Sequence, residues 1–398
     1  HGFIQLEEKE HWNLEEGKSY FVERNGSSMI AFHLPKKDFQ GFHIVASHSD
    51  SPTYRIKEQP EMSVEKHYTK LNIERYGGMI PETWFDRPLS VAGRIIIEEN
   101  GQIKDQLVNI DRDLMIIPNL AIHMSRSSNE SKQLNPQKDL LPLCGGNLTK
   151  DGFEEMIAKE SGVEKEDILS YDLFLYNRMR GTTLGINEEF VVAPKLDDLE
   201  CAYSSIEGML NAKLSKDYVT VCAVFDNEEV GSGTKQGAGS TFFPEVLKRI
   251  SYLCGKNEEE YYMAVADSFM LSADNAHAVH PNYQDKTDPT NRPYINEGIV
   301  LKYNASQKYT TDANSAALVK YLCKKEKIKC QVFFNRSDML GGSTLGNILT
   351  GQVSIKAADI GLPQLSMHST YETAGCKDLD DMITLLGSFY ELGKEVQI

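Results

Sequence analysis

Two adjacent carboxylates, Glu228 and Glu229, directly follow an apolar run, residues 219–225, that predicts a buried strand of a parallel sheet. In open α/β sheets the reactive groups gather at the carboxyl ends of the strands. A glutamate pair at such a place can divide two tasks, because one carboxylate can carry protons while the other binds a metal. Taken alone, the pair could also be solvated at a turn, so the interpretation depends on the segments that accompany it.

A second apolar run, residues 41–46, leads to His48 and Asp50. A carboxylate two residues from a histidine can accept the second ring N–H, which fixes the tautomer and raises the basicity of the histidine as a metal ligand. The alternative is a histidine that caps a strand end.

Asp197 and Asp198 stand between a short apolar approach and a helix-like pattern that continues to Gly208. Asp198 could serve as the N-cap of that helix. Asp197 has no comparable structural role, so it is the stronger candidate for chemistry.

Asp274 follows the predicted strand at residues 269–273, and two histidines, His277 and His280, come shortly after it. The histidines have the i, i+3 spacing of paired ligands on a helix, but Pro281 argues against a helix here. We therefore favour Asp274 over the histidines as a ligand.

His368 ends a mostly apolar stretch that begins at residue 357. A single histidine in such a place is more often structural than a ligand. Together, however, the five segments supply two histidines and several carboxylates from distant parts of the chain, which is what a two-metal hydrolytic centre needs. These ligand types suit zinc, and also manganese or cobalt, and the absence of paired cysteine ligands argues against a structural zinc site.

In order along nearly the whole chain, the sequence resembles the aspartyl aminopeptidase family. The segments that carry the resemblance are residues 24–28, 48–52, 76–78, 83–87, 117–124, 195–199, 226–232, 272–283 and 363–369.

The resemblance implies two divalent metal ions per chain. It assigns His48 and Asp274 to one metal, Glu229 and His368 to the other, and Asp197 to the bridge between them.

The resemblance also implies that Glu228 is the general base and that Asp50 orients His48. All seven positions carry the expected residue type, which predicts an active enzyme. Asp198 departs from the pattern, since some relatives have Asn there, but the bridging position itself is unchanged.

The implied activity is the removal of the N-terminal residue from peptides, with acidic Asp or Glu side chains read by Lys302. Lys302 could instead be an edge or surface cation, because it follows a strand-like segment. Some relatives prefer neutral or apolar N-termini.

A related two-metal deacylase or carboxypeptidase is a further alternative, for which we expect Glu in place of Asp274 and an arginine clamp. A non-enzymatic assembly module predicts broken ligands, and none is broken.

The order of the motifs predicts an α/β catalytic domain with a mostly parallel sheet, residues 1–53 and 189–398, interrupted by an inserted β-rich domain, residues 54–188. Asn100-Gly101 is typical of a hairpin in the insert, and the apolar spacing over residues 378–392 predicts a helix in the catalytic domain.

The resemblance gives the inserted domain a role in oligomerisation, in a tetrahedral homododecamer built from dimers. It also implies that His123 reaches the active site of a neighbouring subunit. From the sequence alone, a histidine at a strand end is the favoured interpretation of His123.

Composition limits the partners. The net charge of −16 disfavours nucleic acid and anionic membrane surfaces, and no apolar run approaches the roughly 18–20 residues of a membrane span. Seven cysteines without a CxxC pair indicate reduced thiols and a cytoplasmic setting. The chain opens at His1 rather than Met, so we expect further residues ahead of it.

Overall fold

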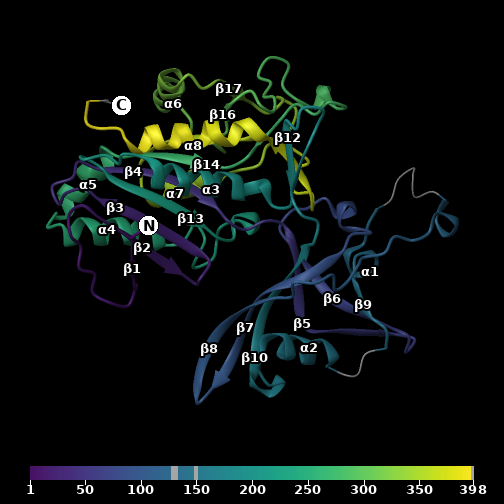
Figure 1. Ribbon diagram of the computed structural model, residues 1–398. Helices are drawn as coiled ribbons and strands as arrows, with labels where there is room; N and C mark the ends of the chain where they lie inside the picture. Colours follow the sequence, from purple (N-terminus) through teal and green to yellow (C-terminus); the bar gives the residue numbers. More distant parts are fainter. Residues whose placement is uncertain (127–132, 148–150, 396–398) are drawn as a thin grey trace. The chain divides into compact units, whose positions relative to one another are not determined.

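The structure is a computed structural model that describes residues 1–126, 133–147 and 151–395. Within these ranges the chain divides into two units (Figure 1). The first unit comprises His1–Ser51, Thr182–Met367 and Glu372–Ile398, and the second comprises Pro52–Gly181 and His368–Tyr371. The chain thus leaves the first unit after Ser51 and re-enters it at Thr182.

Within the described residues, a 9-stranded sheet forms the centre of the first unit. Its strands, in spatial order, are β1 (Ile4–Leu6), β2 (Lys18–Arg24), β3 (Ser28–Leu34), β13 (Val219–Phe225), β4 (Phe42–His48), β14 (Phe269–Ala273), β18 (Lys356–Gly361), β16 (Ile299–Lys302) and β17 (Cys330–Phe333). The central strands β13, β4, β14 and β18 are all parallel, whereas β3 and β16 run antiparallel to their central neighbours. The prediction of a mostly parallel α/β core is confirmed.

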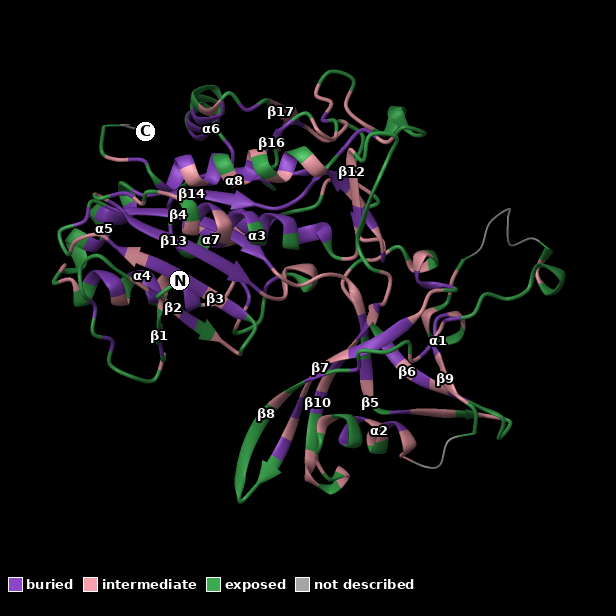
Figure 2. Cartoon of the chain, in the orientation of Figure 1, coloured by how far each residue is buried: buried purple, intermediate pink, exposed green. Residues whose placement is uncertain are grey.

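The central strands are buried on both faces. Every residue of β4, β13 and β14 is buried (Figure 2). Successive side chains of a strand point to opposite faces. Ile44 and Ala46 therefore enter one hydrophobic core while Val45 enters the other. This two-sided burial is why these strands appear in the sequence as continuous apolar runs.

Helices cover both faces of the sheet. One core contains residues of α4 (Phe242–Leu253), α5 (Glu258–Ala266) and α7 (Leu345–Gln352). The other contains residues of α3 (Leu196–Asn211), α6 (Ala313–Glu326) and α8 (Cys376–Tyr390). The first unit is therefore a three-layer sandwich, and α8 confirms the helix predicted near the end of the chain (Figure 1).

The first unit also contains a small mixed sheet that the sequence did not predict. Its strands, in spatial order, are β11 (Thr182–Leu184), β12 (Phe190–Ala193), β20 (Glu372–Gly375), β19 (Pro363–Leu365) and β15 (Ala276–His277). They have two to four residues each, too few for a periodic pattern to be recognised.

The second unit is built on an antiparallel 6-stranded sheet, within the described residues. Its strands, in spatial order, are β8 (Gln102–Asn109), β7 (Leu89–Glu99), β10 (Ile168–Asn177), β5 (Thr53–Val64), β6 (Tyr68–Tyr76) and β9 (Leu143–Gly145). Its helical segments are η1 (Pro81–Trp84), η2 (Ile122–Met124), α1 (Pro136–Asp139), α2 (Gly152–Ser161) and η4 (Lys165–Asp167). Asn100 and Gly101, both with positive φ, form the turn between β7 and β8, so the predicted hairpin and the predicted β-rich character are confirmed.

In the described part of the chain, every helix is too short or too polar to cross a membrane. All seven cysteines lie in this part, and each is a free thiol.

Candidate metal centre

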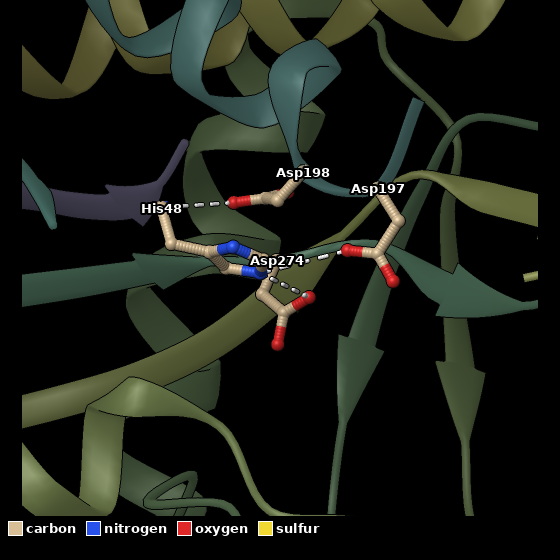
Figure 3. A group of neighbouring side chains, drawn as sticks. All are labelled: His48, Asp197, Asp198 and Asp274. Atoms are coloured by element: carbon tan, nitrogen blue, oxygen red, sulfur yellow. Dashed lines mark hydrogen bonds and ion pairs between the residues drawn. The ribbon is translucent and has the colours of Figure 1, made fainter. Parts of the chain in front are cut away.

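His48 is the last residue of β4, and its side chain is only 1% exposed. Its Nδ1 atom lies 3.1 Å from the backbone oxygen of Asp50 and 3.3 Å from the Asp50 carboxylate. Its Nε2 atom faces two other carboxylates, at 3.5 Å from Asp197 Oδ1 and 3.9 Å from Asp274 Oδ1 (Figure 3). The ring is thus held on one side by Asp50 and offers its second nitrogen to a group of acidic side chains.

Asp197 and Asp198 lie at the start of α3, where the backbone is not yet helical and the peptide bond between them is cis. The backbone N–H of Asp197 donates to Glu372 Oε2 at 3.0 Å, and its carbonyl accepts from the Ser51 hydroxyl at 2.9 Å. Asp198 does not act as a helix cap but accepts a hydrogen bond from the backbone N–H of His48 at 3.1 Å. Both residues are therefore fixed by contacts with distant segments.

Asp274 follows β14, and its backbone N–H donates to Ile360 at 3.1 Å. Its carboxylate lies 3.6 Å from the ammonium of Lys302. A Cβ atom at Gly361 would come within 2.0 Å of the Asp274 carbonyl oxygen, so only glycine allows β18 to approach this closely. The position of Asp274 thus depends on its immediate neighbours on β16 and β18.

Glu228 and Glu229 form the start of a short 3₁₀ helix, η5 (Glu228–Val230), beyond the end of β13. Their backbone N–H groups donate to the two oxygens of the Asp50 carboxylate, at 3.0 and 3.1 Å. Asp50 was predicted only to orient His48. Its carboxylate also fixes the turn that carries both glutamates, a role that depends on contacts between segments far apart in the sequence.

The arrangement fits a divalent cation. Donor atoms of His48, Asp197, Asp198 and Asp274 all lie within 4.8 Å of one another, as do donor atoms of His48, Glu228 and Glu229. Ligands of a tetrahedral zinc at ~2.1 Å are separated by roughly 3.4 Å, close to the distances around His48 Nε2. Imidazole nitrogen and carboxylate oxygen are donors that zinc and manganese accept.

The pKa values in this cluster show the cost of gathering buried carboxylates. Burial, with Asp274 next in effect, raises the pKa of Glu228 to about 7, and burial together with Asp197 raises the pKa of Glu229 to about 10. Burial alone would lower the pKa of His48, but the surrounding aspartates raise it well above its ordinary value. A cluster of this kind is strained without additional positive charge.

Lys302 provides some of that charge. Its side chain is 2% exposed, its Nζ donates to the backbone oxygen of Asn275 at 2.9 Å, and it lies beside Asp274. The alternative of an edge or surface cation is therefore wrong.

The other two predicted site residues belong to the second unit. The backbone oxygen of His368 accepts from Ile80 N at 3.0 Å, and His123 lies exposed in η2 rather than at a strand end. Their predicted roles at the metal centre stay predictions.

Two residues that support the site were missed by sequence reasoning. Glu372 holds the backbone of Asp197, and Gly361 makes room for Asp274. Glu372 does follow His368 closely in the sequence, but no local pattern links it to Asp197. The glycine gives no signal either, because its requirement arises from a neighbouring strand.

Comparison with known proteins gives a consistent result. The family model for "Aminopeptidase I zinc metalloprotease (M18)" matches residues 1–390. The probable M18 family aminopeptidase 2 of Clostridium novyi (strain NT) is 46% identical over 402 residues, covering 98% of this chain and 92% of that protein.

Solved structures share the fold. A chain of the Ape4 and Nbr1 complex superposes with a TM-score of 0.94 at 38% identity, covering 98% of this chain and 79% of that one. The mApe1 dodecamer of S. cerevesiae gives a TM-score of 0.84 at 28% identity, covering 98% of this chain and 89% of that one. The resemblance found in the sequence and the α/β fold are both confirmed.

The raised pKa values predict how the metal-free protein responds to pH. Glu229 has an ordinary pKa of 4.5 and a folded pKa of about 10, so between these values the folded state binds more protons than the unfolded state. The free energy of unfolding then falls as pH rises through this window. We expect the Tm of the metal-free protein to decrease between about pH 5 and pH 8, and to decrease less steeply in Glu229→Gln. The Tm values are measured by calorimetry in the presence of a chelator. Equal slopes of Tm against pH for the two proteins would show that the pKa of Glu229 is not raised in the folded state.

Proposed function

Since the chain belongs to the M18 family of zinc aminopeptidases, we propose that it removes acidic residues from the N-termini of peptides at a centre of two divalent metal ions. The chain is a metallo-aminopeptidase, a hydrolase of peptide bonds. The number of metals, their ligands and the preference for acidic residues are the parts that we add.

The proposed ligands are His48 and Asp274 for one metal, Glu229 and His368 for the other, and Asp197 for both. The observation that carries this assignment is the convergence of Asp197 and Asp274 on His48 Nε2, at 3.5 and 3.9 Å. When bound, such metals supply Lewis-acid chemistry, which polarises the scissile carbonyl and makes water acidic enough to lose a proton near neutral pH. Zinc is the first choice for a member of this family, with manganese and cobalt as alternatives.

Glu228 is the proposed general base and acid. It takes a proton from the attacking water at its carboxylate and returns that proton to the leaving amine. Its backbone N–H is fixed by Asp50, which holds the glutamate beside the proposed ligands, and in the metal-free protein burial raises its pKa to about 7. The Asp50 carboxylate also lies 3.3 Å from Nδ1 of His48, so the same carboxylate contacts a proposed ligand and the turn that carries the base.

The acidic preference rests on Lys302. A negatively charged substrate side chain would be repelled by the carboxylates of Asp197, Glu228 and Asp274 unless a cation offset their charge. Lys302 is such a cation, buried beside Asp274. Once Asp274 is a metal ligand, part of its negative charge is offset by the metal, which leaves the charge of Lys302 to a substrate carboxylate.

One observation favours the alternative of a neutral or apolar preference. The Lys302 ammonium already donates to the Asn275 carbonyl and lies 3.6 Å from Asp274, with the Tyr309 ring 5.4 Å away. A lysine satisfied in this way could serve the metal ligand alone. Activity measurements on Lys302 variants separate the two.

Assembly and location complete the proposal. The superposition on the S. cerevesiae mApe1 dodecamer supports a homododecamer, which we propose to be tetrahedral and built from dimers. Around His123, the side chains of Leu120, Ile122 and Met124 are exposed, as expected of a surface that a neighbouring subunit covers. The free thiols fit a reducing, cytoplasmic setting, and the partners are peptides and other copies of the chain rather than nucleic acid or membranes.

Removal of metal should abolish hydrolysis of aminoacyl-anilides, and added zinc, manganese or cobalt should restore it. Asp197→Ala should lose both ions, because the proposed bridge serves both. The matched control is Asp285→Ala, which removes an exposed carboxylate and should keep two ions per chain. Two ions per chain in Asp197→Ala, measured by elemental analysis, would contradict the ligand assignment.

Glu228→Gln should keep the metals and lose about 10²–10⁴-fold in kcat, because the amide preserves the shape of the side chain but cannot accept a proton. Metal content, measured on the same preparation, should equal that of the unmodified protein. Near-normal turnover would transfer the role of base to another group, with His280 the next candidate.

Lys302→Leu should selectively weaken hydrolysis of Asp and Glu anilides, by about 2–5 kcal/mol in transition-state binding, as expected when a buried charge loses its partner. Hydrolysis of Ala and Leu anilides should be spared or improved. Metal content is measured in parallel, because Lys302 lies 3.6 Å from the carboxylate of Asp274, a proposed metal ligand. Equal losses of kcat/KM on acidic and apolar substrates would refute the acidic preference and favour the purely supporting role.

A further inference from the structure

Asn275, the residue after Asp274, has a fully buried side chain whose polar atoms are all engaged. Its Nδ2 donates to Gln364 Oε1 at 2.7 Å and to Glu200 Oε2 at 3.1 Å. Its Oδ1 accepts from the thiol of Cys201 at 3.0 Å. We name these four residues, Asn275, Glu200, Cys201 and Gln364, the Asn275 network.

All four residues of the Asn275 network are buried. Asn275 is 3% exposed, Gln364 1%, Cys201 0% and Glu200 7%. Burying an amide pair and a carboxylate costs free energy unless each group finds its partners, and apolar residues of similar volume would fill the same space at lower cost. A network of this composition therefore calls for a role beyond filling the core.

The network joins the segments that carry the proposed ligands. Glu200 and Cys201 belong to α3, whose first turn contains Asp197, while Asn275 is joined by a single peptide bond to Asp274. Gln364 lies on β19, which pairs with β15 just after Asn275. The Asn275 side chain thus ties the start of α3 to the turn that carries Asp274.

Other contacts leave the Asp274-Asn275 turn little freedom. Lys302 donates to the Asn275 carbonyl at 2.9 Å, and β18 approaches so closely at Gly361 that a Cβ there would meet the Asp274 carbonyl. These contacts attach the turn to β16 and β18, whereas the Asn275 side chain attaches it to α3, whose first turn contains Asp197. Loss of that attachment would leave the Asp274 carboxylate free to move relative to Asp197. Sites for metals and catalysis tolerate displacements of only about 0.5 Å.

We propose that Asn275, with Glu200 and Gln364 as its partners, is a positioning residue that holds Asp274 at the distance from Asp197 that a bound cation requires. The inference rests on the proposed function, since it takes Asp197 and Asp274 to be metal ligands. Asparagine is the residue type that fits, because two acceptor oxygens face its Nδ2 while a thiol donor faces its Oδ1.

The test exchanges the donor and the acceptor. Asn275→Asp replaces the amide nitrogen with an oxygen that confronts the acceptor oxygens of Glu200 and Gln364. We expect it to bind zinc about 10–100-fold more weakly, as measured by competition with a chelator, because partners that orient metal ligands typically contribute this much. Asn275→Asp combined with Glu200→Gln restores a donor opposite the new oxygen and should recover much of that affinity. The matched control is Asn314→Asp, an exposed position on α6 where zinc affinity should be unchanged.

A merely structural network would give a different pattern. It would lower the Tm of the metal-free variant without changing zinc affinity, and unchanged affinity in Asn275→Asp would overturn the proposal. If Asn275→Asp does not fold, the double variant and Gln364→Met, which removes one acceptor, carry the test. Zinc affinity unchanged in Gln364→Met would then overturn it.

Failure of the proposed function is distinguishable from failure of this inference. In the former case the unmodified protein itself would not bind zinc at His48 and Asp274. In the latter, the unmodified protein would bind zinc and the Asn275 variants would bind it equally well.

Discussion

The main physical constraint on this structure is the repulsion among the carboxylates around one buried histidine, which the rest of the site must offset. Donor atoms of Asp197, Asp198 and Asp274 lie within 4.8 Å of those of His48, in a region where water cannot screen them. Burial raises the pKa of Asp198 and Asp274, whereas Asp198, Asp197 and Asp50 raise the pKa of His48. Positive charge beside these carboxylates lowers the free-energy cost of keeping them ionised, and Lys302 supplies part of that charge. The chain belongs to a family of zinc metalloproteases, and a divalent cation held by this cluster would supply further positive charge without another side chain.

The first unit delivers these side chains by burying its strands on both faces. Because helices cover both sides of the sheet, the apolar bodies of β4, β13 and β14 are fixed in register, and their polar residues begin where the strands end. Parallel neighbours end at the same edge, which brings His48 and Asp274 together although 225 residues separate them in the sequence. Hydrogen bonds that the carboxylates of Asp50 and Glu372 accept, and one that the Ser51 hydroxyl donates, then fix the loops beyond that edge.

The sequence predicted the parts of the fold that local patterns determine. β13 and β14 match their predicted ranges because continuous apolar runs are bounded sharply by polar residues, and the β7–β8 hairpin follows from the backbone preference of Asn100-Gly101. The small sheet of β11, β12, β20, β19 and β15 was not predictable, since its short strands are defined by distant partners.

The same limit applies to the site. The candidate ligands could be identified because acidic residues and histidines follow predicted strands. The resemblance to a known family then assigned each of them to one of the two metals or to the bridge. The capping of η5 by Asp50 and the burial of Lys302 could not be identified, because both depend on which segments meet in space. A residue's position after a strand shows at which edge of the sheet its backbone lies. It does not show which charged groups surround its side chain.

Lys302 shows how the charge balance of the site couples metal binding to substrate choice. Its ammonium is committed to Asp274 and to the Asn275 carbonyl. Under the proposed ligand assignment, a bound metal offsets part of the negative charge of Asp274. The ammonium of Lys302 can then pair with a second carboxylate. An acidic substrate side chain and Asp274 would therefore both pair with the ammonium of Lys302. It follows that a preference for acidic N-termini requires the loaded metal centre, while binding of apolar residues does not depend on this exchange.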